Sequence, residues 1–237
     1  CKIDIGKFWG EVTKYARENK VDPTLSYMLI LENKMHEAGV EISRENLINY
    51  GKQLKLFSGV DDWFGRIKKY GKENNIEIEH YIISSGLTNM IEGCSFYSQI
   101  DRVYACEYIF KDARGLWPKL SVNYSNKVQY LYRIHKGAFE VNDQEGVNKK
   151  KYLGDHIHVP FENMIFFGDG ETDVPTFNVL NKNNGKSICI YEDQDQKSID
   201  IAKKLFSDGR VHHLVKNDYS EGSEVDNLVK EIIKSKT

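Results

Sequence analysis

The segment Met164–Asp173 constrains the fold of this chain more than any other. Four apolar residues are followed at once by Gly168, and carboxylates come next at Asp169 and Asp173. A short apolar run that ends at a glycine predicts a buried strand inside a parallel sheet. Gly168 and Gly170 would allow a tight turn after that strand at low steric cost. The segment therefore predicts a strand, a turn with two aspartates, and a following helix.

The two aspartates are the first candidates for a functional site. They follow the C-terminal end of the predicted strand, which is where open α/β sheets bind their ligands. Carboxylate oxygens in that position suit Mg²⁺, which usually keeps several waters and also uses phosphate oxygens. In a simpler interpretation, Asp173 caps the helix and Asp169 is only solvated. The complete run Gly-Asp-Gly-Glu-Thr-Asp favours a metal site at Asp169 and Asp173.

The rest of the chain divides into two patterns. Residues 7–55 show apolar stripes at helical spacing and predict helices without a strand. From residue 59 onward, strand and helix patterns alternate, which predicts a doubly wound, mostly parallel α/β sheet. Further strands are expected at 76–83, 103–110, 116–122, 187–191 and 211–215, and helices at 87–93 and 124–135. Residues 137–160 are polar and punctuated by glycine, and they predict a long irregular excursion.

Two other positions stand at predicted strand or helix ends. Ser84 and Ser85 close the strand 76–83 and precede a helix, where a hydroxyl and free backbone N–H groups would hold an anion. A serine that merely caps the helix is the alternative. Lys127 lies at the start of a helix, and a solvated surface lysine is its alternative. A hydroxyl, an ammonium and paired carboxylates together would form a site for phosphate and Mg²⁺.

Composition excludes several classes of protein. The net charge is −2, so no overall field draws the chain to nucleic acid. The run Lys149–Lys151 is too short to change this and predicts a solvated loop. No apolar run approaches the ~18 residues of a membrane span, and no signal-peptide pattern is visible. The four scattered cysteines predict reduced thiols in a cytoplasmic protein. The sequence does not indicate an oligomeric state.

In this order, these residues resemble the haloacid dehalogenase superfamily. Ile82–Gly86 is similar to its second motif, an apolar strand that ends in serine or threonine. Lys127 stands where the third motif has a lysine, and Gly168–Asp173 matches the fourth. The resemblance covers roughly residues 57–215. It implies a Rossmann-like core at 57–237 and a helical cap at 1–56, inserted between the first and second motifs.

The resemblance also implies roles for the candidate residues. Ser85, or alternatively Ser84, would hydrogen-bond the transferring phosphoryl group, with Gly86 completing the binding loop. Lys127 would neutralise charge on the phosphoryl group and the nucleophile. Asp169 would bind Mg²⁺, and Asp173 would bind it or orient a bound water. All of these roles are electrostatic, as phosphoryl transfer requires.

The family's first motif has no counterpart before the helices. It is an apolar strand followed by Asp-x-Asp, whose first aspartate becomes an aspartyl phosphate. Asp4 is followed by Ile5 and Gly6 and does not fit. A shortened sequence and a protein that kept the scaffold without the chemistry are the two explanations. We expect the first, because losing a central strand would remove apolar burial worth roughly 1.5–3 kcal/mol per side chain.

The expected function is Mg²⁺-dependent hydrolysis of a small phosphorylated metabolite through an aspartyl-phosphate intermediate. A non-catalytic protein that binds phosphate in the same pocket is the alternative. An ordinary nucleotide-binding domain is disfavoured, because neither Gly-x-Gly-x-x-Gly nor a Walker A pattern follows a strand. Gly185-Lys186-Ser187 precedes a predicted strand and does not open a helix.

Overall fold

The computed structural model describes residues 4–111, 114–148 and 157–236. The chain forms two compact units, Cys1–Lys55 with His80–Asn123, and Leu56–Glu79 with Tyr124–Thr237. Each unit is described by itself below. The predicted Lys149–Lys151 loop lies outside the described residues, as does part of the predicted excursion 137–160. Within the described ranges, no helix is both long and apolar enough to cross a membrane.

Three helices open the first unit, as the sequence predicts. They are α1 (Ile5–Asn19), α2 (Pro23–Glu37) and α3 (Arg44–Gly51). Each begins after a residue whose side chain accepts a backbone N–H of the first turn: Asp4, Asp22 and Ser43. Asp4 is therefore a helix cap, in agreement with its rejection as a nucleophile.

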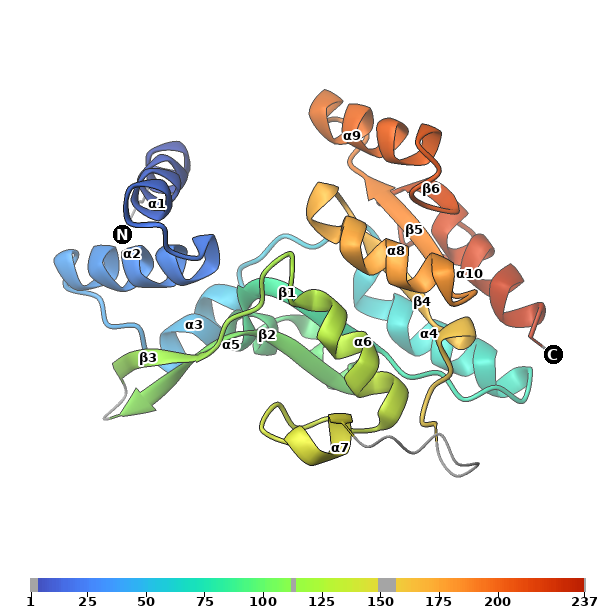
Figure 1. Cartoon of the computed structure of the whole chain (residues 1–237). Coiled ribbons are helices and arrows are strands. Elements are labelled where there is room, and N and C mark those ends of the chain that lie inside the picture. Colours follow the sequence, from blue (N-terminus) through green and yellow to red (C-terminus); the bar gives the residue numbers. More distant parts are fainter. Residues whose placement is uncertain (1–3, 112–113, 149–156, 237) are drawn as a thin grey trace. The chain divides into compact units, whose positions relative to one another are not determined.

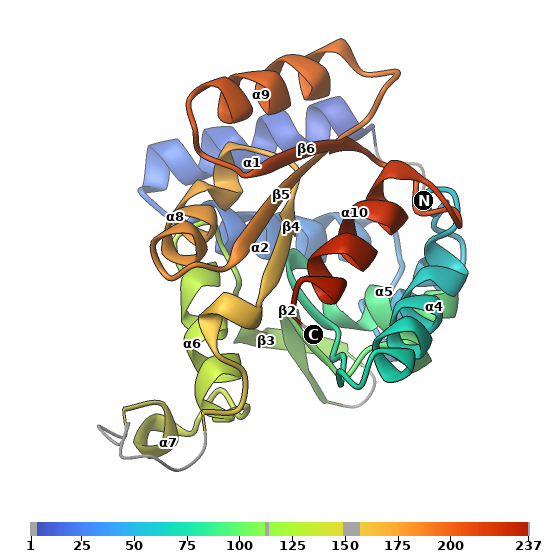
Figure 2. The same ribbon diagram turned by 90° about the vertical axis from the view of Figure 1, so that its right-hand side faces the viewer.

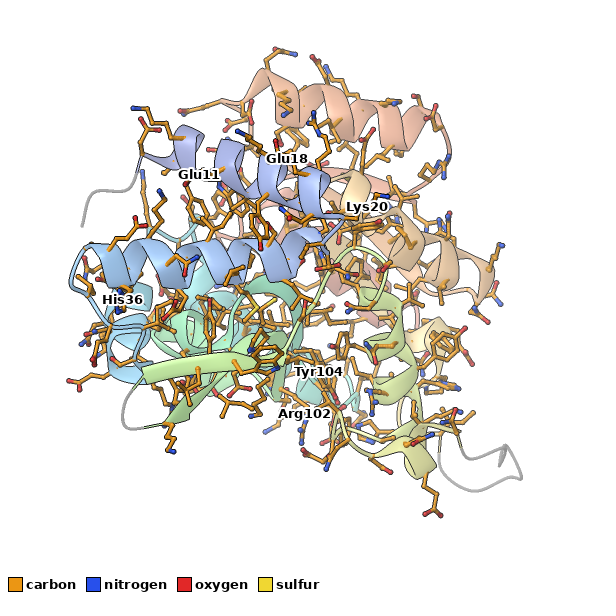
Figure 3. All side chains as sticks on the ribbon, turned by 60° about the vertical axis from the view of Figure 1, so that its left-hand side comes forward. Glu11, Glu18, Lys20, His36, Arg102 and Tyr104 are labelled. Atoms are coloured by element: carbon orange, nitrogen blue, oxygen red, sulfur yellow. The ribbon has the colours of Figure 1, made fainter. Side chains whose placement is uncertain are left out.

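Helices α1 and α2 pack side by side. Figure 3 shows them with Glu11 and Glu18 on α1 and His36 near the end of α2. The Ser26 hydroxyl donates to the Val12 carbonyl over 3.0 Å, and Lys34 pairs with Glu11 at 2.9 Å. Ser26 is fully buried, and this bond gives its hydroxyl a partner.

The sheet of the first unit follows these helices in the chain. It contains β1 (Tyr81–Leu87), β2 (Arg102–Lys111) and β3 (Arg114–Leu120), with α5 (Thr88–Glu92) and the short helix η1 (Ser95–Gln99) between β1 and β2. Strand β1 pairs with β2 in parallel, and β3 returns antiparallel to β2 (Figure 1). The predicted strand 76–83 was placed too early, because β1 begins at Tyr81 and continues through both serines to Leu87.

The second unit has three layers, a parallel sheet with helices on both of its faces. Its strands are β4 (Ile165–Gly168), β5 (Lys186–Tyr191) and β6 (His213–Lys216), with β5 in the middle. Helices α4 (Val60–Glu73) and α10 (Glu224–Lys234) cover one face, and α8 (Val174–Lys182) and α9 (Gln196–Ser207) cover the other. Figure 2 shows α8 and α10 on opposite sides of the sheet.

Alternation along β5 explains this layering. Ile188 and Ile190 pack with Trp63 of α4, whereas Cys189 between them packs with Phe177 of α8. Successive side chains of a strand point to opposite faces, so an apolar run buries both. The remaining helices of this unit are α6 (Lys127–Lys136), α7 (Gln144–Asn148), η2 (Phe161–Asn163) and η3 (Glu171–Asp173).

The α/β class is confirmed, but the strands do not form one doubly wound sheet. The described strands form two three-stranded sheets, and the first contains an antiparallel strand. Strand β4 lies at the edge of its sheet and is half-buried along its length, not fully buried as predicted. Strand β1 is likewise an edge strand. Periodicity indicates which side chains prefer burial, whereas strand neighbours depend on tertiary pairing.

The compact units also divide the chain differently from the predicted domains 1–56 and 57–237. Residues 80–123 group with the N-terminal helices because the two segments approach closely. A Cβ on Gly51 would overlap the Met90 carbonyl, and one on Gly93 would overlap that of Ile48. The Tyr108 hydroxyl also donates to the Met28 carbonyl over 2.6 Å. The three described cysteines are free thiols.

Candidate functional site

The candidate site of the second unit forms where β4 ends. After Gly168 the chain passes Asp169, makes the short helix η3 and enters α8. The Asp173 side chain makes no capping bond to α8. One of its oxygens accepts from the Lys127 ammonium at 2.7 Å, and the other accepts from the Asp169 backbone N–H at 3.1 Å. The interpretation of Asp173 as a simple helix cap is therefore wrong.

Lys127 and Asp173 form a buried ion pair. Their side chains are 11% and 3% exposed. Lys127 is the first residue of α6, and α6 packs against α8, which Asp173 precedes. The interpretation of Lys127 as a solvated surface lysine is therefore also wrong. A charge this far from solvent requires a partner, so each side chain holds the other in place.

Gly168 is needed because Asp173 lies against it. A Cβ at position 168 would come within 2.7 Å of Cβ and Oδ2 of Asp173 and of the Phe177 ring. Gly170 was expected to relieve the turn as well, but its φ is −170°, an extended conformation open to any residue. A Cβ on Gly170 would meet nothing within 4 Å. Only the first glycine of the motif therefore has a steric role.

Asp169 has a different environment from Asp173. Asp169 is exposed to solvent. Among the described residues, no basic side chain forms an ion pair with its carboxylate. Partial desolvation and then the Asp173 carboxylate raise the pKa of Asp169, while Lys127 acts in the opposite direction. Desolvation, followed by Asp169, also raises the pKa of the Tyr219 phenol to about 12. The end of β4 thus carries more negative charge than Lys127 balances.

This surplus of negative charge fits a divalent cation. Within the described part of the chain, no cluster of three or more histidine, cysteine or acidic side chains is placed to hold a metal. Mg²⁺ does not need such a cluster, because one or two carboxylates, waters and substrate oxygens complete its shell. Asp169 is the available ligand. Asp173 is already engaged by Lys127.

Ser84 and Ser85 lie in the first unit, within β1. The pairing of β1 with β2 is irregular between Ser84 and Leu87, so the serines occupy a distortion of the strand. The Ser84 hydroxyl accepts from the Gly86 N–H at 3.0 Å, and Ser85 is exposed. Neither serine caps α5, whose N-cap is Leu87. Distortions of this kind often redirect side chains beside functional sites.

The structure therefore brings Lys127, Asp169 and Asp173 together in one unit. Ser84, Ser85 and Gly86 belong to the other unit. Sequence reasoning missed Tyr219, whose pKa is raised by desolvation and by Asp169 and whose ring packs edge-on against Trp63 with centroids 5.4 Å apart. No motif identifies Tyr219, because it follows β6 and lies fifty residues beyond Asp169 in the chain.

Replacing Gly168 by alanine should destabilise the protein by about 1–3 kcal/mol, the usual cost of overpacking. The new methyl group would displace the Asp173 side chain and weaken its bonds to Lys127 and to the Asp169 backbone. Urea unfolding measures the loss. Gly170→Ala is the matched control, because its methyl group has free space. Equal stability of the two variants would contradict the close approach at Gly168.

The second unit is thus a three-layer α/β unit with a lysine–carboxylate cluster at a strand end. Among curated proteins, the chain is similar to an uncharacterized protein of Borreliella burgdorferi (strain ATCC 35210 / DSM 4680 / CIP 102532 / B31). The two are 27% identical over 260 residues, which cover 98% of this chain and 87% of that protein. No family model matches the chain, and no solved structure matches it significantly.

Proposed function

We propose that this chain is the major part of a Mg²⁺-dependent phosphohydrolase of the haloacid dehalogenase type. It would act on a small phosphorylated metabolite. The observation that carries the proposal is the buried Lys127–Asp173 pair beside the open Asp169 carboxylate at the end of β4. A lysine and carboxylates at one strand end form an electrostatic site for a phosphoryl group and its cation.

Each residue has a specific task in this proposal. Asp169 would hold Mg²⁺, which neutralises phosphoryl oxygens when bound. Asp173 would fix the position of the Lys127 ammonium and reach the ion or one of its waters. Lys127 would place its charge beside the phosphoryl group. These groups stabilise developing charge but do not attack phosphorus.

The nucleophile would come from a strand with an Asp-x-Asp end, paired to the outer edge of β4. Ile165, Phe166 and Phe167 are apolar, yet they are only half-buried on an edge strand. An added parallel strand would cover them and pair with the backbone at this edge of the sheet. This addition would produce the Rossmann-like core with a helical cap that the resemblance implies. The attacking carboxylate would form the aspartyl phosphate and expel the alcohol.

The Asp-x-Asp at Asp193–Asp195 does not fill this role. It follows β5, the middle strand of its sheet, whereas the first motif of the family would follow a strand that precedes Ser84 and Ser85 in the chain. Asp193 pairs with Lys216 at 2.6 Å, and Asp195 caps α9 by accepting the Lys197 N–H. Both carboxylates therefore have structural partners, and we assign them no catalytic task.

Titration calorimetry with Mg²⁺ tests the metal half of the proposal. Asp169→Asn should weaken Mg²⁺ binding by at least about tenfold, because a neutral amide replaces the charged ligand. Glu171→Gln is the matched control: Glu171 is an exposed carboxylate of the same turn, paired with Lys204 at 3.4 Å. Unchanged affinity in Asp169→Asn, or an equal loss in both variants, would remove Asp169 from the site.

A non-catalytic phosphate-binding protein is the second candidate. It is favoured by the Lys127–Asp173 pair beside Asp169, which would hold a phosphate and its cation without attacking phosphorus. We expect the chain by itself to bind Mg²⁺ and phosphate weakly without turnover. Adding an upstream apolar strand that ends in Asp-x-Asp should restore Mg²⁺-dependent hydrolysis of p-nitrophenyl phosphate. Continued inactivity of the extended, folded protein would favour the binding function.

A further inference from the structure

A cavity of about 790 Å³ lies within the first unit. Residues of α1, of α2, of the end of β1 and of α5 line it, and all of them belong to that unit. Its volume lies in the range of sites for small organic ligands, which are typically apolar with a few placed polar groups. The cavity is therefore large enough to hold a small organic molecule inside the first unit alone.

Most of the cavity wall is apolar. The Trp9 and Tyr27 rings lie 5.8 Å apart at an angle of 42°, and Leu31 and Leu87 add aliphatic surface. Trp9 is 50% exposed, whereas its neighbour Phe8 is buried in the contact between α1 and α2. A half-exposed indole at the wall of a cavity offers apolar area to a ligand.

The charge of the cavity is confined to one end. Arg17 is the single charged residue of the lining, and it lies in the last turn of α1. It follows Trp9 by eight positions, which places the two about 12 Å apart along the helix axis. Within the described ranges, no carboxylate forms an ion pair with Arg17. The adjacent Glu18 lies 4.0 Å from Lys14 and does not line the cavity.

Two hydroxyl groups of the lining are also available to a ligand. Thr24 lies in the first turn of α2, next in the chain after the turn that follows Arg17, and Tyr27 lies one turn further. Neither hydroxyl has a hydrogen-bond partner within the part of the chain that the structure describes. Burial raises the pKa of the Tyr27 phenol, so it remains a protonated donor. Such groups normally have a partner when they are removed from water, and a ligand oxygen would supply one.

We propose that this cavity binds a medium-chain fatty acid, with its carboxylate at Arg17 and Thr24 and its alkyl chain along Trp9 and Leu31. A guanidinium and a hydroxyl are the donors that suit a carboxylate. The apolar wall extends farther from Arg17 than a single aromatic ring would reach, so an elongated chain covers it best. The inference does not rest on the proposed phosphatase function, because the first unit supplies every lining residue.

Titration calorimetry on the whole chain tests this inference with octanoate, octanol and acetate as probes. Octanoate should bind with one site per chain, at least about fivefold more tightly than octanol, which lacks the charge. It should bind at least about a hundredfold more tightly than acetate, which leaves the apolar wall uncovered.

Two pairs of variants locate the site. Arg17→Gln should remove the preference for octanoate over octanol, and Lys7→Gln, an exposed lysine of α1 outside the lining, should keep it. Trp9→Ala should weaken octanoate by about tenfold. Trp117→Ala is its control, because Trp117 is 69% exposed on β3 and does not line the cavity.

Three results would overturn the inference. Equal affinity for octanoate and octanol in the natural sequence would show that Arg17 does not select an anion. Equal losses in Trp9→Ala and Trp117→Ala would show that octanoate binds to exposed apolar surface outside the cavity. Failure of octanoate to bind would remove the site altogether, whereas circular dichroism of each variant shows that its helices are intact.

Discussion

Replacing Lys127 by methionine should weaken phosphate binding and strengthen Mg²⁺ binding, each by about tenfold. The opposite signs follow from the geometry of the buried pair. The Lys127 ammonium holds Asp173 at 2.7 Å, so the lysine competes with a cation for that carboxylate. Without the lysine, Asp173 would be free to bind Mg²⁺, but a phosphate bound at the proposed site would lose the positive charge of Lys127. Titration calorimetry with each ion measures both effects.

The same substitution should lower stability by about 3–5 kcal/mol without metal, because it leaves the Asp173 carboxylate buried and unpaired. Added Mg²⁺ should restore more stability to the variant than to the natural sequence. In the version extended by an Asp-x-Asp strand, hydrolysis should fall by about 10²–10³-fold. Lys182→Met is the control, because Lys182 lies in the last turn of α8. Parallel losses of Mg²⁺ and phosphate binding would contradict competition at Asp173.

Replacing Asp226 by alanine should destabilise the second unit by about 3–5 kcal/mol. The Asp226 side chain is fully buried, and it contacts the side chains of Arg66 at 3.2 Å and Lys230 at 2.7 Å. It also accepts the Gly222 N–H at 2.9 Å. The Arg66–Asp226 ion pair therefore connects α4 to α10 on one face of the sheet. Urea unfolding measures the loss, and Asp200→Ala on α9 is an exposed control.

The stability that Asp226 contributes should depend on pH in one direction. Burial alone would raise the pKa of Asp226, but Lys230, the Gly222 amide and Arg66 together lower it. A lowered folded-state pKa means that the contribution is complete well above the ordinary value near 4 and is lost as the pH falls below it. The difference in stability between the natural sequence and Asp226→Ala should therefore shrink in acid. A constant difference down to pH 2 would contradict this assignment.

The sequence by itself determined the local structure well. The caps at Asp22 and Ser43 and the apolar spacing that follows them define helices where they were predicted. The run before Gly168 predicts β4 within one residue. These features depend on neighbours a few positions away, because capping bonds and side-chain alternation act over a single turn or strand.

The tertiary structure decided which strands pair, how each aspartate is used and where a ligand can enter. Sequence alternation could not show that β4 is an edge strand, since pairing joins segments that are distant in the chain. It also could not separate the buried, lysine-paired Asp173 from the open Asp169, four residues away. Trp9 and Ser85 line one cavity although 76 positions separate them. Burial, charge partners and cavities arise when distant segments pack together, and no local pattern records that packing.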